Sequence, residues 1–148
     1  METLNQLLSN KILFIPISAW VIAQISKTLF GLIISKRFSL ERLYGAGGMP
    51  SAHAALVCAL AITSARILGV DSEIFAISVL FAAVVMYDAM GVRHAVGEQA
   101  KIINRLVDSL EEEEGENNTG ELKEVLGHTP LEVLAGALLG ILVAIFLV

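Results

Sequence analysis

Four long apolar runs dominate the chain, and short or polar segments separate them. The runs cover residues 12–35, 54–70, 74–91 and 131–148. A helix needs about 20 apolar residues to cross the hydrocarbon core of a bilayer, so each run is long enough, or nearly so, to span a membrane. The pattern predicts an all-α fold, that of a polytopic membrane protein with about four transmembrane helices.

The polar section between the third and fourth runs divides into three pieces. Between residues 92 and 110, apolar positions recur at helical spacing with charges between them. This predicts an amphipathic helix that either lies on the membrane surface or continues the third span. Residues 111–120 are acidic and contain Gly and Asn, so we expect a mobile acidic loop there. Residues 121–127 are expected to form a short helix that ends at Gly127.

The composition supports a single membrane-embedded domain. The chain has 148 residues, of which 55% are hydrophobic and 17% are charged, and its mean hydropathy is +0.73. This length leaves no room for a second domain, so residues 1–148 are expected to form one. The net charge of −5 is matched by five glutamates between residues 111 and 116, so no basic surface suggests nucleic acid as a partner. The one cysteine, Cys58, excludes an intramolecular disulfide and a cysteine-rich zinc site.

The cations are distributed unevenly between the two sides of such a bundle. With four spans, the segment after the first run and the section after the third lie on one side. Seven of the ten Lys and Arg residues lie on that side: Lys36, Arg37, Arg42, Arg93, Lys101, Arg105 and Lys123. Positive residues favour the cytoplasmic side, so we expect a protein of the cell inner membrane with both termini outside.

Ionisable residues gather at the cytoplasmic end of the predicted bundle. Lys27 lies near the end of the first run, and His53 lies at the start of the second. Asp88 and Arg93 lie at the end of the third run, and His128 and Glu132 lie at the start of the fourth. A charge in hydrocarbon is costly, and ionisable residues in spans are therefore functional candidates. The topology predicts one site at this face.

This group of residues suits a phosphate-sized anion. The second and fourth helices begin near Ser51 and Pro130, and their unpaired N–H groups favour negative charge. Arg93 offers a planar guanidinium and Lys27 a point charge for phosphate oxygens. With two histidines close to a bound phosphate, one can attack as a nucleophile and the other can protonate the leaving oxygen.

Simpler roles fit some of the same residues. Thr129, Pro130 and Glu132 match a capping box with proline at the first helical position. In that interpretation Glu132 only satisfies backbone donors. His53 and His128 can likewise be interfacial residues with no catalytic task.

The remaining candidates also leave alternatives open. Lys27 can extend to the lipid headgroups, and Asp88 is most simply a partner for Lys27 or Arg93. The Gly136-x-x-x-Gly140 pattern allows close helix contact within one subunit or between subunits. A purely structural scaffold that recruits partners through this pattern is therefore another interpretation.

Two segments resemble motifs of a known superfamily. Residues 49–53 (Met-Pro-Ser-Ala-His) and 127–136 (Gly-His-Thr-Pro-Leu-Glu-Val-Leu-Ala-Gly) are similar to the second and third motifs of the type 2 phosphatidic acid phosphatase superfamily. That superfamily joins lipid phosphate phosphatases with vanadium-dependent haloperoxidases. Nearly the whole chain, including residues 86–89 and 91–93, resembles its divergent branch of small integral membrane proteins.

The resemblance implies a membrane lipid phosphate phosphatase that uses no metal and no cofactor. Such an enzyme hydrolyses a phosphomonoester or pyrophosphate through a phosphohistidine intermediate. His128 would attack phosphorus, Glu132 would hold its other ring nitrogen, and His53 would protonate the leaving alkoxide. Ser51 and the nearby backbone would help to hold the phosphate oxygens.

The chain departs from the superfamily pattern at several positions. Ala52 replaces the usual glycine of the second motif, Glu132 replaces the aspartate of the third, and Leu122 stands where an arginine is expected. The first motif is missing. Our hypothesis is that Lys27 and Arg93 supply the cationic clamp from new positions. The expected phosphate-binding residues are Arg93, Lys27, Ser51 and Asp88.

The same departures support a rival function, and the small number of predicted spans suggests an oligomer. The rival is a non-catalytic or weakly catalytic membrane protein that binds or transports lipid headgroups or anions. Membrane members of the superfamily usually have six spans, so a homodimer could complete the bundle of a four-span chain. The expected partners are a membrane lipid phosphate substrate, the bilayer and a second copy of the chain.

Overall fold

The computed structural model describes residues 2–35, 48–114 and 127–148, and every regular element in these ranges is helical. In chain order the helices are α1 (Glu2–Leu8), α2 (Lys11–Ser35), α4 (Ala52–Leu68), α5 (Glu73–Met90), α6 (Val92–Glu114) and α7 (Pro130–Leu147). The predicted all-α fold is confirmed. Each of the four apolar runs forms one long helix, with bounds within two residues of those expected. The apolar pattern did not predict α1, a short helix of seven residues.

Three segments are long and apolar enough to cross a membrane by length and composition: Lys11–Leu32, Glu73–Ser109 and Pro130–Leu147. Helix α4 is also apolar but has 17 residues. At 1.5 Å per residue it is about 26 Å long, slightly less than the hydrocarbon core of about 30 Å. The chain is thus a helical membrane protein, with three candidate spans and one shorter apolar helix among the residues that the structure describes.

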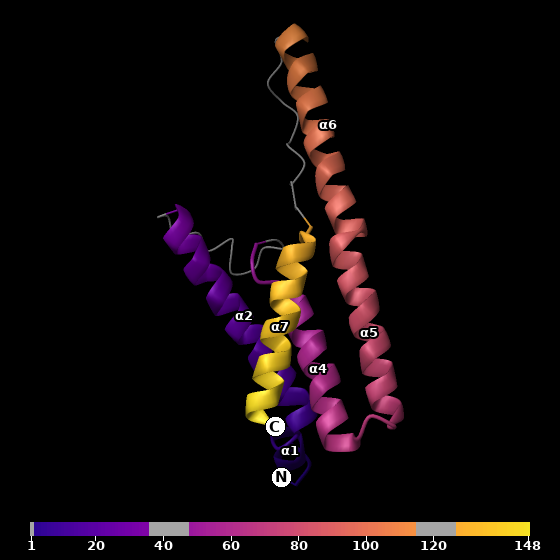
Figure 1. The fold of residues 1–148 in the computed structure, drawn as a ribbon. Helices are drawn as coiled ribbons and strands as arrows, with labels where there is room; N and C mark the ends of the chain where they lie inside the picture. Colours follow the sequence, from indigo (N-terminus) through magenta and orange to yellow (C-terminus); the bar gives the residue numbers. More distant parts are fainter. Residues whose placement is uncertain (1, 36–47, 115–126) are drawn as a thin grey trace.

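The bundle consists of the four apolar helices α2, α4, α5 and α7, which alternate in direction (Figure 1). Helix α4 is in contact with the other three. Helix α4 packs against α7, α2 and α5, and α2 also packs against α7. This is possible because the buried face of α4 is made mostly of small residues: Ala52, Ala54, Ala55, Ala59, Ala61, Thr63 and Ser64. Small side chains let helix backbones approach closely.

Side-chain caps define where the helices begin. Ser51, Ser72 and Thr129 are the N-caps of α4, α5 and α7, and each side chain accepts a hydrogen bond from a backbone N–H in the first turn. Between α4 and α5 the chain turns at Gly69, whose φ of 94° favours glycine. The α4–α5 connection is therefore a short turn that runs from Gly69 to the N-cap Ser72.

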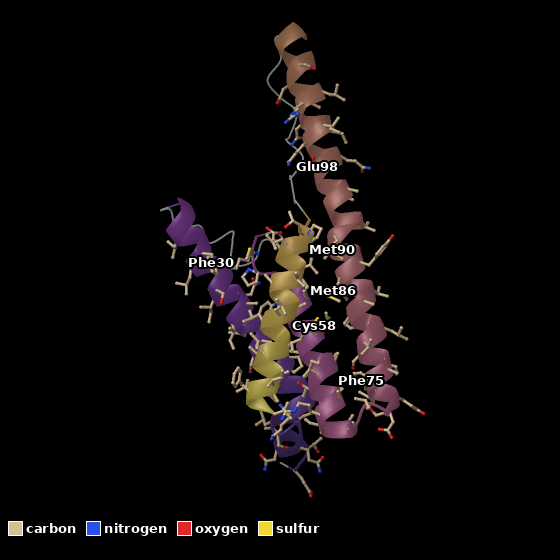
Figure 2. All side chains as sticks on the ribbon, viewed as in Figure 1. Phe30, Cys58, Phe75, Met86, Met90 and Glu98 are labelled. Atoms are coloured by element: carbon tan, nitrogen blue, oxygen red, sulfur yellow. The ribbon has the colours of Figure 1, made fainter. Side chains whose placement is uncertain are left out.

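Polar and sulfur-containing side chains also link α4 to α5 and α7. The Ser64 and Ser78 hydroxyl oxygens are 3.4 Å apart, and Arg66 Nη1 donates to the Ile145 carbonyl at 2.6 Å. Cys58 Sγ lies 3.8 Å from Met86 Sδ, on the facing side of α5 (Figure 2). These contacts hold α5 and α7 against α4 along the bundle.

Helix α6 follows α5 with only Gly91 between them and runs beyond the bundle in nearly the same direction (Figure 1). Of the two placements that the sequence leaves open, the structure thus shows the helix as a continuation of α5. Its apolar residues Val92, Val96, Ile102, Ile103 and Leu106 are exposed. The helix continues through Glu114, four residues into the stretch expected to be an acidic loop. Residues 115–120, and 121–126 of the expected short helix, lie outside the described residues.

Candidate active site

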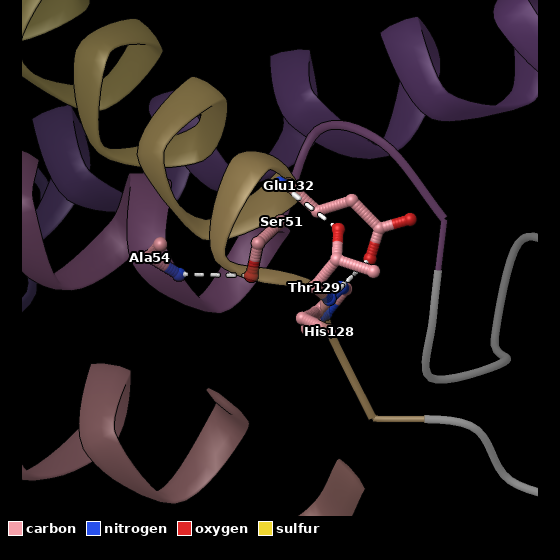
Figure 3. A network of polar contacts seen from close by, with 5 residues as sticks. All are labelled: Ser51, Ala54, His128, Thr129 and Glu132. Carbon is pink, nitrogen blue, oxygen red and sulfur yellow. Dashed lines mark hydrogen bonds and ion pairs between the residues drawn. The ribbon is translucent and has the colours of Figure 1, made fainter. Parts of the chain in front are cut away.

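A histidine and a glutamate form a hydrogen-bonded pair where α7 begins (Figure 3). His128 directly precedes the N-cap Thr129 and is 5% exposed. Its Nδ1 lies 3.2 Å from Glu132 Oε2. An ionised carboxylate can only accept a hydrogen bond, so this contact favours the tautomer of His128 that carries its proton on Nδ1. Nε2 is then the ring nitrogen with nucleophilic character.

The same glutamate also closes a capping box. Glu132 Oε2 accepts a hydrogen bond from the Thr129 N–H at 3.0 Å, and the Glu132 N–H donates to Thr129 Oγ1 at 3.4 Å. One carboxylate oxygen therefore meets both the helix start and the imidazole (Figure 3). The capping role predicted for Glu132 is confirmed, and it does not compete with contact to His128.

A backbone hydrogen bond joins the start of α4 to the start of α7. The Ser51 N–H donates to the Glu132 carbonyl oxygen at 3.0 Å. Ser51 is fully buried, and its Oγ accepts from the Ala54 N–H at 3.4 Å as the N-cap of α4. A hydroxyl that accepts one hydrogen bond can still donate its own hydrogen. Ser51 is thus placed beside Glu132, where the starts of α4 and α7 meet.

The end of α5 reaches the same place through the backbone. The His128 N–H donates to the Ala89 carbonyl oxygen at 3.1 Å, and the half-buried Asp88 is the preceding residue. A backbone acceptor leaves no mark on the residue type, so sequence reasoning missed Ala89. The side chain of Arg93, in the first turn of α6, lies outside what the structure describes.

Lys27 is buried beside these helix starts. It is 8% exposed, so its side chain is buried among the helices. A Cβ placed on Gly48, whose φ is +85°, would lie 3.3 Å from Lys27 Cε, which shows how closely the backbone before Ser51 covers the lysine. Lys27 lies close enough to Glu132 for the charges of the two side chains to interact. The structure therefore brings Lys27, Ser51, Glu132 and His128 together.

His53 shares this end of the bundle but lies on another face of α4. It is exposed, whereas Ala55, two residues later, packs on Gly140 of α7. Two residues of a helix point about 160° apart around its axis. The start of α4 thus carries His53 on the side away from the surface that packs on α7.

The two glycines of the Gly136-x-x-x-Gly140 pattern contact α4 of the same chain. A Cβ on Gly136 would lie 2.2 Å from the Ser51 carbonyl oxygen, and a Cβ on Gly140 would lie 2.1 Å from the Ala55 carbonyl oxygen. The pattern therefore packs helices within one subunit.

Among the residues that the structure describes, no three His, Cys, Asp or Glu side chains gather as metal ligands.

The fold and this site are those of a helical membrane protein whose helix starts hold an imidazole–carboxylate pair. The sequence matches the Divergent PAP2 family over residues 8–143, and the chain belongs to that family. It is similar to the uncharacterized membrane protein YuiD of Bacillus subtilis (strain 168), with 40% identity over 153 residues and 96% of each chain covered. No solved structure matches the chain.

Proposed function

We propose that the protein is a membrane lipid phosphate phosphatase that hydrolyses a phosphomonoester or pyrophosphate through a phosphohistidine intermediate. The observation that supports this most directly is the buried His128, whose Nδ1 faces Glu132 Oε2 at 3.2 Å. A carboxylate in this position orients the imidazole and stabilises the positive charge that develops on it during attack.

In the first step His128 Nε2 attacks phosphorus and the bond between phosphorus and the leaving oxygen breaks. The leaving oxygen keeps the electron pair and takes a proton from His53, acting as a general acid. In the second step water attacks the phosphohistidine, the P–N bond breaks, and His53 accepts the proton released by water. The products are an alcohol (or a phosphate monoester from a pyrophosphate) and inorganic phosphate.

The phosphate oxygens would be held by the Lys27 ammonium and the Ser51 hydroxyl. Lys27 lies within reach of the Glu132 charge, and a bound phosphate dianion would offer the ammonium a second anionic partner. Arg93 and Asp88 complete the proposed phosphate site from the α5–α6 junction, where the Ala89 carbonyl already contacts the His128 backbone.

The proposed topology places α4 as a fourth span and the site at the cytoplasmic leaflet of the inner membrane. Helix α6 then projects on the cytoplasmic side as an amphipathic helix. The tail of the substrate stays in lipid while its head reaches the helix starts. Phosphatidic acid, phosphatidylglycerophosphate and polyprenyl pyrophosphate fit this description.

The test is phosphate release by detergent-solubilised protein from a panel of these three lipids. We expect release by the wild type, no turnover by a folded His128→Asn variant, and inhibition by vanadate, which resembles the pentacoordinate transition state. Release by His128→Asn at the wild-type rate would exclude His128 as the nucleophile. Indifference of the wild type to vanadate would count against phosphoryl transfer through histidine.

The placement of His53 favours a second candidate, a protein that binds lipid headgroups or anions without efficient turnover. His53 is exposed on the side of α4 away from α7, whereas the proposed nucleophile His128 is buried. This candidate predicts that labelled phosphatidic acid binds to the wild type and is recovered intact. It also predicts that Lys27→Met weakens that binding, whereas His128→Asn does not.

A further inference from the structure

Gly136 of α7 contacts the backbone of the residue that begins α4. A Cβ on Gly136 would lie 2.2 Å from the Ser51 carbonyl oxygen and 3.0 Å from both its carbonyl carbon and its nitrogen. All three atoms belong to the main chain, so no side-chain rotation can make room. Any residue larger than glycine must move the start of α4 away from α7.

Ser51 is also held by Glu132, which lies one turn before Gly136 on α7. Its N–H donates to the Glu132 carbonyl oxygen at 3.0 Å, while the Glu132 carboxylate lies 3.2 Å from His128 Nδ1. Gly136, Ser51, Glu132 and His128 therefore form a continuous series of contacts, which we call the joint between α4 and α7. Only a glycine at 136 allows this short distance between the Ser51 carbonyl and α7.

From these contacts we infer that Gly136 is a positioning residue for the phosphatase proposed above. It sets the distance between His128 on α7 and the start of α4, which carries Ser51 and His53. Ordinary contact between a Cβ and an oxygen begins near 3.4 Å, so Gly136→Ala displaces Ser51 by about 1 Å. A misplacement of this size at reacting groups lowers the rate by about 100-fold. The inference rests on the proposed function.

Gly140→Ala is the matched control. Its Cβ would meet the Ala55 carbonyl oxygen at 2.1 Å, an equally severe clash one helical turn farther from the site. Ala55 has no hydrogen bond to Glu132 among the described contacts, and the Ser51–Glu132 bond holds the helix starts together. We expect both variants to lose similar thermal stability in detergent, but only Gly136→Ala to lose about 100-fold in kcat.

A second pair of variants tests the joint at Ser51 itself. Ser51 has φ −70°, which proline accepts. Ser51→Pro removes the N–H that donates to Glu132 and places the ring Cδ against the same carbonyl oxygen, so it breaks this contact. Ser51→Ala keeps the N–H, and both variants lack the hydroxyl. We expect kcat to be lower in Ser51→Pro than in Ser51→Ala.

A readout that needs no phosphatase activity separates this inference from the proposed function. Diethyl pyrocarbonate modifies exposed imidazoles, and mass spectrometry reports its rate at each histidine. The buried His128 should react slowly in the wild type, in Gly140→Ala and in Ser51→Ala, with the exposed His53 as internal reference. His128 should react much faster in Gly136→Ala and Ser51→Pro.

The outcomes are distinguishable. Faster modification of His128 in Gly136→Ala and Ser51→Pro alone supports the joint, even if the wild type releases no phosphate and the proposed function fails. Equal modification in both members of each pair shows that Gly136 serves general packing only and overturns the inference. Loss of kcat that simply follows melting temperature across all four variants overturns it as well.

Discussion

The starts of α4 and α7 are built alike, yet they place their histidines differently. Both helices begin with a hydroxyl N-cap, Ser51 or Thr129. His128 precedes its cap, is buried and contacts Glu132 in the first turn. His53 follows its cap within the helix and is exposed. A residue before the cap can fold back over the first turn, whereas a residue inside the helix points where the helical period directs it.

This difference indicates that the two histidines are prepared to different degrees. His128 has its ring orientation set by Glu132 before any ligand arrives. His53 is exposed at the start of α4, so we expect its alignment to depend on the bound substrate. A preorganised nucleophile and a substrate-aligned acid should respond differently to mutation, pH and leaving group.

Glu132→Gln should have the largest effect on the His128 side of the comparison. Glutamine also completes a capping box, so the helix start and the melting temperature should be nearly unchanged. The uncharged amide cannot stabilise an imidazolium or hold its tautomer, and the analogous change in a serine-protease triad costs about 10⁴-fold in kcat. Steady-state kinetics and thermal unfolding of the same preparation measure both quantities. A wild-type kcat would show that Glu132 only caps the helix.

His53→Gln should lower kcat by about 10² to 10⁴-fold on a lipid phosphate, as expected for removal of a general acid. An acid must be protonated to act, so the fall in rate as pH rises should disappear in this variant. The fall in rate as pH decreases, which reports a nucleophile that must be neutral, should remain. The pH profile of kcat measures both limbs.

An aryl phosphate sharpens this prediction because its leaving group needs no proton. The His53→Gln variant should release the first equivalent of p-nitrophenol nearly as fast as the wild type, whereas His128→Asn should release no leaving group from either substrate. If His53→Gln slows this first release of the leaving group by the same factor on both substrates, His53 binds phosphate and is not the acid.

Thr129→Ala should have the smallest effect, on stability more than on rate. It removes the side-chain half of the capping box, which lowers the free energy of unfolding by about 1 kcal/mol. The Thr129 backbone N–H that donates to Glu132 Oε2 remains, so kcat should change little. Ser72→Ala at the start of α5 removes a similar cap far from the site and is the control. A large loss of kcat in Thr129→Ala alone would show that the hydroxyl acts in the site.

Several features could be predicted from the sequence because they depend on one element at a time. The four apolar runs, the caps at Ser51 and Thr129, and the four-residue spacing of His128 and Glu132 all follow from local periodicity and backbone hydrogen bonding. The alternating direction of consecutive helices then places the candidate residues at one end of the bundle (Figure 1).

Contacts between helices could be decided only by the tertiary structure, because they depend on which faces of distant segments pack together. The sequence left open whether Gly136 and Gly140 pack within or between subunits, and the structure places both on α4 of the same chain. It also buries Lys27 under the backbone of Gly48 and brings the Ala89 carbonyl to His128. Residue type carries no signal for such backbone contacts, because every residue offers the same carbonyl and nearly every residue the same N–H.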